Sequence, residues 1–160
     1  MTNGKLVAGF LVGAGLIAGL VMYWLQVYAF YERIEEDVAP TMVEVTGKEG
    51  QMLSIPIHDY QGIDSDSSPL RYRACYRLDP AALADAQRMI RPTPTNGPSW
   101  FDCYSARTIH DDLESGRAMA YLGQRDYRPA IDRVIAVYPD GSAFEWRQTN
   151  EEAEDRRIIE

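Results

Sequence analysis

Residues 6–31, LVAGFLVGAGLIAGLVMYWLQVYAFY, decide how the chain is organised. They contain no charged residue, and Gln26 is the one strongly polar side chain among them. As a helix this stretch would be about 39 Å long, which exceeds the roughly 30 Å hydrocarbon core of a bilayer. Aromatic residues that suit the membrane interface gather at its end: Tyr23, Trp24, Tyr28 and Tyr31. We therefore expect one transmembrane helix, preceded by a short stub, within residues 1–31.

A cleaved signal peptide is the alternative interpretation, because residues 27–29 (Val-Tyr-Ala) could form a small-residue cleavage site. The apolar run is longer than the roughly 7–15 residues of a signal-peptide core. The basic region before it consists of Lys5 and the α-amino group. The sequence therefore favours an uncleaved anchor.

The flanks of the apolar stretch predict its orientation. Lys5 precedes it, whereas the segment after it is acidic, with one basic residue among ERIEED at 32–37. The positive-inside rule then predicts a cytoplasmic N-terminus and an exported C-terminal domain. Cys75 and Cys103 agree with this, because an even pair of cysteines outside the cytoplasm indicates a disulfide. Closing a loop of that length stabilises a domain by about 3–4 kcal/mol in the chain-entropy model.

The remaining residues predict a small α+β domain, namely a mainly antiparallel sheet with two short helices. Alternating and β-branched stretches predict strands at 42–46, 52–57, 70–76, 118–122, 131–138 and 143–148. Capping signals predict helices at 79–90 and 105–115, and turn residues predict tight turns at 47–50 and 139–142. We expect a juxtamembrane linker at 32–42, a polar loop at 58–69, the domain at 43–148, and a charged, mobile tail at 149–160.

The expected domain is acidic. Lys5 apart, the chain carries 15 basic and 24 acidic residues, a formal charge of −9. This balance disfavours nucleic acid and anionic lipid headgroups as partners. A basic protein surface or a cationic ligand fits better, and an acidic surface that only keeps the domain soluble is the simpler alternative.

Glycine pairs in the apolar stretch are the clearest candidate contact surface. Gly9 with Gly13, and Gly15 with Gly19, each have the small-xxx-small spacing that lets helices approach closely in lipid. At 100° per residue the two pairs lie about 120° apart around the helix. We therefore expect packing against integral membrane subunits on two faces, and the alternative is the ordinary glycine content of a membrane helix.

Neither a catalytic residue nor a cofactor or metal site is predicted. His58 and His110 lack further ligands at zinc-site spacing, and Asp64–Ser68 lacks the glycine and the final glutamate of a calcium loop. A C-x-x-C pair is absent, so the cysteines favour a structural bridge over redox chemistry. An enzyme would need a cleft that brings one of three acids near a histidine: Asp59, Asp102 or Asp132.

Three aromatic residues flank Cys103, namely Trp100, Phe101 and Tyr104. Packing around the expected disulfide is the simpler role for these rings. The alternative is a contact with a partner protein, because large aromatic side chains dominate binding hot spots.

Several stretches carry a resemblance to a known family: residues 69–75 (PLRYRAC), 100–103 (WFDC), 121–125 (YLGQR) and 131–137 (IDRVIAV). With the apolar stretch, they resemble an alphaproteobacterial family of short single-span membrane proteins that is classed as a domain of unknown function. The resemblance implies a bacterial inner-membrane protein with a periplasmic domain, and it transfers no catalytic residue.

These observations favour a non-catalytic accessory or assembly subunit of a bacterial inner-membrane complex. A respiratory oxidase or a bc1 supercomplex is the expected host, and a c-type cytochrome is the expected kind of basic periplasmic partner. The alternative is a periplasmic sensor or ligand-binding module that signals through a partner protein, which a well-formed pocket would favour.

Overall fold

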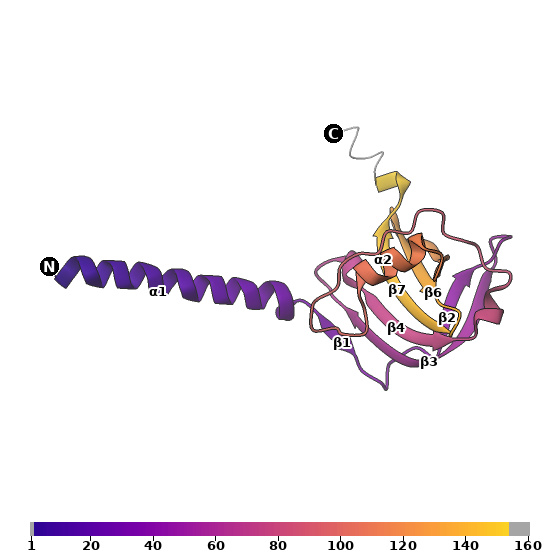
Figure 1. The fold of residues 1–160 in the computed structure, drawn as a ribbon, viewed down its shortest axis with the longest axis horizontal. Coiled ribbons are helices and arrows are strands. Elements are labelled where there is room, and N and C mark those ends of the chain that lie inside the picture. The colour runs from indigo at the N-terminus through magenta and orange to yellow at the C-terminus, as the bar shows by residue number, and fades with distance from the viewer. Residues whose placement is uncertain (1, 154–160) are drawn as a thin grey trace. The chain divides into compact units, whose positions relative to one another are not determined.

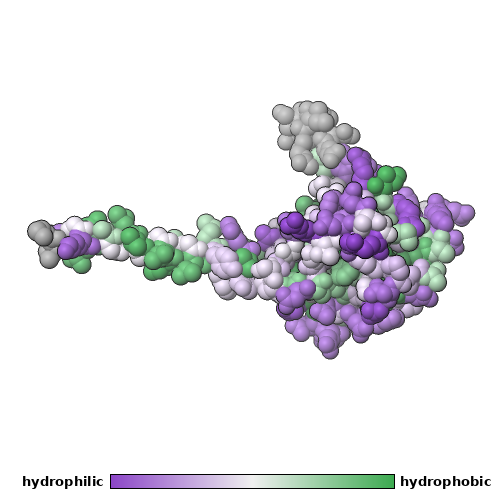
Figure 2. All heavy atoms as spheres, viewed as in Figure 1, coloured by the Kyte–Doolittle hydropathy of each residue, from purple (hydrophilic) through white to green (hydrophobic). Residues whose placement is uncertain are grey.

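The computed structural model describes residues 2–153, and the chain divides into two compact units, residues 1–31 and 32–160. The first unit is the helix α1, Thr2–Trp24, followed by the π-helical segment η1, Leu25–Ala29. Residues Asn3–Ala29 are long and apolar enough to cross a membrane. Figure 2 shows apolar side chains along the length of this helix. The expected apolar helix is therefore confirmed, with a start a few residues before Leu6.

The second unit is built on a curved antiparallel sheet (Figure 1). Its strands are β1 Glu32–Ile34, β2 Met42–Thr46, β3 Met52–Asp64, β4 Arg73–Leu78, β5 Met119–Arg128, β6 Ile131–Val137 and β7 Ser142–Thr149. The strand order is β1-β3-β4-β7-β6-β5, and β2 pairs with β3. Each pair is antiparallel. The predicted α+β class with a mainly antiparallel sheet is confirmed.

Strand β3 bends in its middle, which lets it pair with more strands than the sequence suggested. The register with β4 shifts between His58 and Gln61, and Asp59 has a positive φ of 55°. The first part of β3 pairs with β2, and the last three residues pair with β1. Residues 58–64, expected in a loop, are therefore strand, and residues 32–34, expected in a linker, belong to the sheet.

The helix predicted at 79–90 is wrong beyond its first turn. Asp79 caps the 3-10 helix η3, Pro80–Leu83, as predicted, and its carboxylate accepts the N–H of Ala81 at 2.9 Å. The chain then continues without a helix, because residues 85–89 exchange backbone hydrogen bonds with β2 on one side and with β5 on the other. These bonds replace those that a helix would have made within the segment.

Three local predictions are confirmed by the backbone. The second helix is α2, Ala106–Glu114, and Ser105 caps it by accepting the N–H of Thr108 at 3.3 Å. The turn at 47–50 closes with a hydrogen bond from Gly50 N–H to the Gly47 carbonyl at 3.0 Å. The turn at 139–142 joins β6 to β7, and Gly141 there has a φ of 86°, which favours glycine.

Apolar side chains from strands that are early and late in the sequence pack together on one face of the sheet. The central cluster includes Val43 and Val45 of β2, Ile55 and Ile57 of β3, Tyr72, Ala74, Tyr76, Leu78, Leu83, Ala86, Tyr121, Ile135, Val137 and Ala143. On the other face Trp146 and Ile63 are also fully buried. Helix α2 is bound to the end of β6, because Tyr138 donates a hydrogen bond to Asp112 at 2.7 Å.

A charged pair lies inside the domain. Glu145 of β7 is 3 % exposed, and its Oε1 lies 2.8 Å from Nε of Arg133 on β6. Its Oε2 accepts a hydrogen bond from Tyr76 at 2.9 Å and a longer one from Tyr72 at 3.5 Å. Tyr60 extends the network to the hydroxyl of Tyr72 at 3.1 Å, and burial raises the pKa of Tyr60 to about 12. The tyrosines therefore act as neutral donors to a buried carboxylate.

We predict that Glu145→Ala lowers the free energy of unfolding by about 3–5 kcal/mol, because it leaves the Arg133 guanidinium without its buried counter-ion. Urea unfolding followed by the fluorescence of buried Trp146 measures the change. The exposed control Glu114→Ala should stay within about 0.5 kcal/mol of the wild type. A paired change, Glu145→Leu with Arg133→Met, should recover much of the loss. A single variant as stable as the control would contradict a paired role for Glu145.

Candidate functional site

The glycine pairs of α1 can be described within the helical unit, residues 2–31. Outside the backbone of the helix itself, no atom of this unit lies within 4 Å of a Cβ built on Gly9, Gly13, Gly15 or Gly19. The four glycines thus lie on a regular helix with space at each position, and packing against other helices on two faces stays a prediction.

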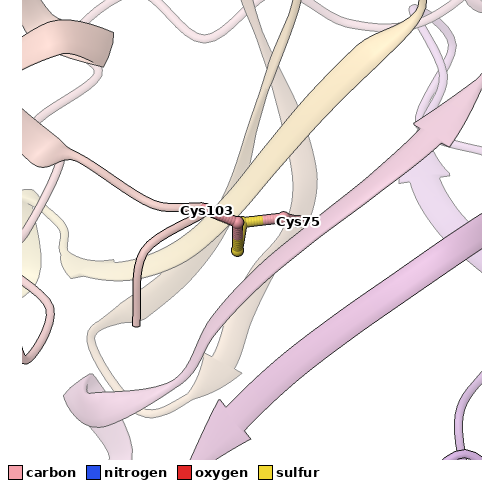
Figure 3. Close-up of a disulfide and its surroundings, with 2 residues drawn as sticks. All are labelled: Cys75 and Cys103. Atoms are coloured by element: carbon pink, nitrogen blue, oxygen red, sulfur yellow. A yellow bond between two sulfur atoms is a disulfide. The ribbon is translucent and has the colours of Figure 1, made fainter. Parts of the chain in front are cut away.

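The predicted disulfide is present, and two of the three neighbouring aromatic residues are buried. Cys103, in the loop before α2, is bonded to Cys75 in β4 (Figure 3). Phe101 is 2 % and Tyr104 is 6 % exposed, so both rings pack inside the domain as the simpler interpretation predicted. Trp100 stays partly exposed with Arg33 of β1 4.9 Å from its ring. Of the three rings, Trp100 alone keeps surface for a partner contact, which stays a prediction.

The structure does not assemble the candidate acids and histidines into a cluster. Among residues 2–153, three or more His, Cys, Asp or Glu side chains do not come together as metal ligands. Asp132 is 1 % exposed, and its Oδ1 accepts the N–H of Asp126 at 3.0 Å and the amide of Asn150 at 2.9 Å. Asp59 and Asp102 are exposed. Asp132 therefore holds the chain around β5 and β6, and the predicted absence of catalytic acids remains a prediction.

The polar loop at 64–68 is held by its own side chains. Oδ1 of Asp64 accepts the N–H of Ser65 at 2.8 Å, and the Ser65 hydroxyl accepts the N–H of Ser67 at 3.3 Å. Asp64 also binds the guanidinium of Arg147 through both oxygens, at 3.2 and 3.1 Å. The Asp64 carboxylate is therefore engaged with the sheet.

A groove on the domain surface follows from the extended segment at 85–91. The Gln87 carbonyl accepts the N–H of Leu122 at 3.0 Å, and Met89 N–H donates to the Ala120 carbonyl at 3.0 Å. The buried amide of Gln148 donates to the Arg91 carbonyl at 2.9 Å, so the chain is also fixed to β7. The groove has a volume of about 270 Å³ and is lined by Gln87, Arg88, Met89, Ile90, Arg91, Leu122, Arg125, Asp132 and Glu151. We call it the arginine groove.

Three arginines surround the arginine groove in an otherwise acidic domain. Arg88 lies over the ring of Tyr121, with its Cζ 4.7 Å from the ring centroid. Arg91 and Arg125 both point to one carboxylate, because Glu151 accepts from Arg91 at 2.6 Å and from Arg125 at 3.4 Å. These contacts fix the position of the guanidiniums and lower the pKa of Glu151, mainly through its hydrogen bond with Arg91. The site binds a carboxylate supplied by the chain itself.

This groove is not predicted by the sequence for two reasons. Residues 79–90 favour a helix, which would have placed Arg88 and Ile90 on different sides of its axis. Glu151 falls in the predicted mobile tail, whereas Asn150 is buried and Glu151 is paired. Residues 154–160 of that predicted tail lie outside the described residues. The one local signal is the pair Arg88 and Arg91 in a chain with an acidic excess, and Arg125 is distant from both in sequence.

Comparison with protein families matches residues 41–156 to one model, described as a family of unknown function (DUF6446). The matched range begins at β2 and includes the arginine groove, the disulfide and the buried Glu145 pair. It does not include α1, although the resemblance found in the sequence extended to that helix. Neither a curated protein nor a solved structure matches the chain.

We predict that Arg91→Ala raises the pKa of Glu151 back towards the usual range of a glutamate, because it removes the strongest donor to the carboxylate. A lowered pKa means that the ion pair is complete above the usual carboxyl range and is lost as pH falls through the lowered value. Titration of the Glu151 side-chain carbonyl by NMR measures both values. Arg107→Ala, on α2, is the control and should leave the Glu151 pKa unchanged. An unchanged pKa in Arg91→Ala would contradict the pairing.

Proposed function

The chain belongs to this family of unknown function, and we propose that it is a membrane-anchored, non-catalytic accessory subunit of a larger membrane complex. In this proposal α1 crosses the membrane and packs against helices of other subunits. The domain then lies on the far side of the membrane from the N-terminus and contacts partner proteins there. The proposal assigns the chain to assembly or stabilisation of its host.

The observation that carries the proposal is the open state of the glycine faces on an apolar helix. In lipid, the hydrophobic effect gives an apolar helix little gain from joining other helices, so close backbone approach at small residues is a main source of association. Gly9, Gly13, Gly15 and Gly19 leave room for such approach, and no side chain of the helical unit, residues 2–31, occupies that space. Two faces about 120° apart suit a helix that contacts two neighbours.

The features of the domain favour binding to partner proteins over catalysis. Its central face is filled by apolar side chains and by the Glu145 network, and each titrating group described there is engaged with another. The acidic excess favours a basic partner surface, for which a c-type cytochrome is the proposed kind. A bacterial inner membrane as location, and a respiratory oxidase or bc1 supercomplex as host, are proposed on the family resemblance and on charge.

A second candidate function is a sensor or ligand-binding module, and the arginine groove is the observation that favours it. Its volume of about 270 Å³ is close to the lower end of the roughly 300–1,000 Å³ usual for small-molecule sites. The groove places three arginines beside apolar side chains such as Ile90, and its carboxylate position is already filled by Glu151. These features suit a contact surface better than an enclosed ligand site.

We predict that Gly9→Leu with Gly13→Leu leaves membrane insertion intact and weakens association with partner subunits at least several-fold, because the leucines hold the helices apart. The measurement is quantitative mass spectrometry of proteins that co-purify after mild detergent extraction. Gly15→Leu with Gly19→Leu tests the second face separately. The matched control, Val7→Leu with Val21→Leu, lies on neither face and should co-purify as the wild type does.

Two outcomes would contradict the proposal. If all three double variants co-purify with the same subunits in equal amounts, α1 is a tether without a packing role. If the wild-type protein leaves the membrane as a lone monomer with no accompanying subunit, it is not a component of a complex.

A further inference from the structure

We propose that the arginine groove binds an acidic segment of a partner protein, and that Glu151 holds this carboxylate site while no partner is bound. The inference rests on the proposed function, because the partner is a subunit or client of the same assembly. It adds the surface that makes the contact and the chemistry of the segment that is recognised.

The type of ligand follows from the contact that the structure already shows. Arg91 and Arg125 converge on the two oxygens of the Glu151 carboxylate, at 2.6 Å to Oε1 and 3.4 Å to Oε2. Guanidiniums arranged in this way suit a planar carboxylate, because their donors match its two oxygens. Arg88 adds a third positive charge that is fixed over Tyr121. The groove is therefore pre-arranged for a carboxylate, and Glu151 supplies one from the same chain.

The Glu151 contact is weak enough to be exchanged. The side chains of Arg91 and Glu151 are 64 % and 54 % exposed, and exposed ion pairs typically contribute about 0.2–1 kcal/mol. A second hollow of about 100 Å³ adjoins the arginine groove and shares Met89, Arg91 and Glu151 with it. The Arg91–Glu151 pair thus stands at the boundary between two hollows.

The neighbouring apolar surface indicates a peptide more than a small anion. Ile90 is 92 % exposed, an exceptional value for a large apolar side chain of the domain, and it stands on the lining of the groove beside Met89. A free phosphate or carboxylate would leave this surface in water. A peptide that carries an apolar side chain next to an acidic one covers Ile90 and reaches the arginines together. The net negative charge of the domain disfavours such a segment at surfaces that lack arginines.

A direct binding experiment on the full chain in detergent micelles tests the proposal. The probe is a fluorescein-labelled peptide of eight residues that alternates glutamate with leucine, and fluorescence anisotropy reports its binding. We expect Glu151→Gln to bind the probe about two- to fivefold more tightly than the wild type, because the internal competitor is removed. Arg91→Ala and Arg125→Ala should each weaken binding at least about fivefold.

Matched variants and probes separate this site from general charge effects. Glu114→Gln and Arg107→Ala remove one negative and one positive charge, respectively, on α2, outside the groove. Both variants should bind the probe as the wild type does. A peptide that alternates glutamine with leucine should bind at least about tenfold more weakly. Ile90→Ser should weaken binding without changing the pKa of Glu151.

Three results would overturn the proposal. The first is equal binding of the glutamate and glutamine peptides, and the second is equal binding by the wild type, Arg91→Ala and Arg125→Ala. The third is displacement of the peptide by inorganic phosphate at equal concentration, which would make the groove a general anion site. The variants are all at exposed positions, and an unchanged thermal unfolding midpoint shows that each one is folded.

The experiment also distinguishes the groove from the helix. Gly9→Leu with Gly13→Leu should bind the peptide as the wild type does, since the probe does not contact α1. If the wild-type chain does not bind the peptide but subunits still co-purify, the groove proposal is rejected and the proposed function of α1 stands. If the chain binds the peptide but no subunit co-purifies, the proposed function of α1 is rejected and the groove proposal stands.

Discussion

The backbone hydrogen bonds of residues 85–89 are the constraint on which the domain depends. Backbone groups at the edge of a sheet need partners, and an unprotected edge invites pairing with another chain. The segment supplies partners to two edges at once, those of β2 and β5. Ala86 pairs with Gly47, which follows β2, and Arg88 pairs with Tyr121 of β5. With these bonds in place, Leu83 and Ala86 close the apolar core, and the side chains on the outer surface form the arginine groove.

Much of the fold could be predicted from short-range signals. The turn at 139–142, the start of α2 and the Asp79 cap depend on side chains within a few residues of one another, and all three are confirmed. The segment at 85–89 depends on partners that lie 39 residues before it (Gly47 with Ala86) and 33 residues after it (Arg88 with Tyr121) in sequence. Its residues Ala86, Gln87, Arg88 and Met89 favour a helix when taken alone, so the local preference pointed to the wrong structure.

Of the two candidate contact surfaces, one could be predicted from local sequence and the other could not. The glycine pairs of α1 are visible in sequence because the spacing on a helix is fixed by the helix itself. The arginine groove is not, because Arg125 and Glu151 approach Arg91 only through the pairing of β5, β6 and β7. The buried Glu145 illustrates the same limit. A glutamate in a strand is expected to be exposed until Tyr76 of β4 and Tyr72, just before β4, are known to donate hydrogen bonds to it.

The position of β7 has a consequence for how the domain folds. This strand is the last in the described sequence, yet it lies between β4 and β6 and pairs with both along most of its length. Before β7 has formed, β4 and the β5–β6 hairpin each have an open edge. The sheet is therefore completed by its last strand, and non-local pairing of the kind that joins β4 to β7 is slow. Until that pairing is made, the facing edges of β4 and β6 are open to pairing with another chain.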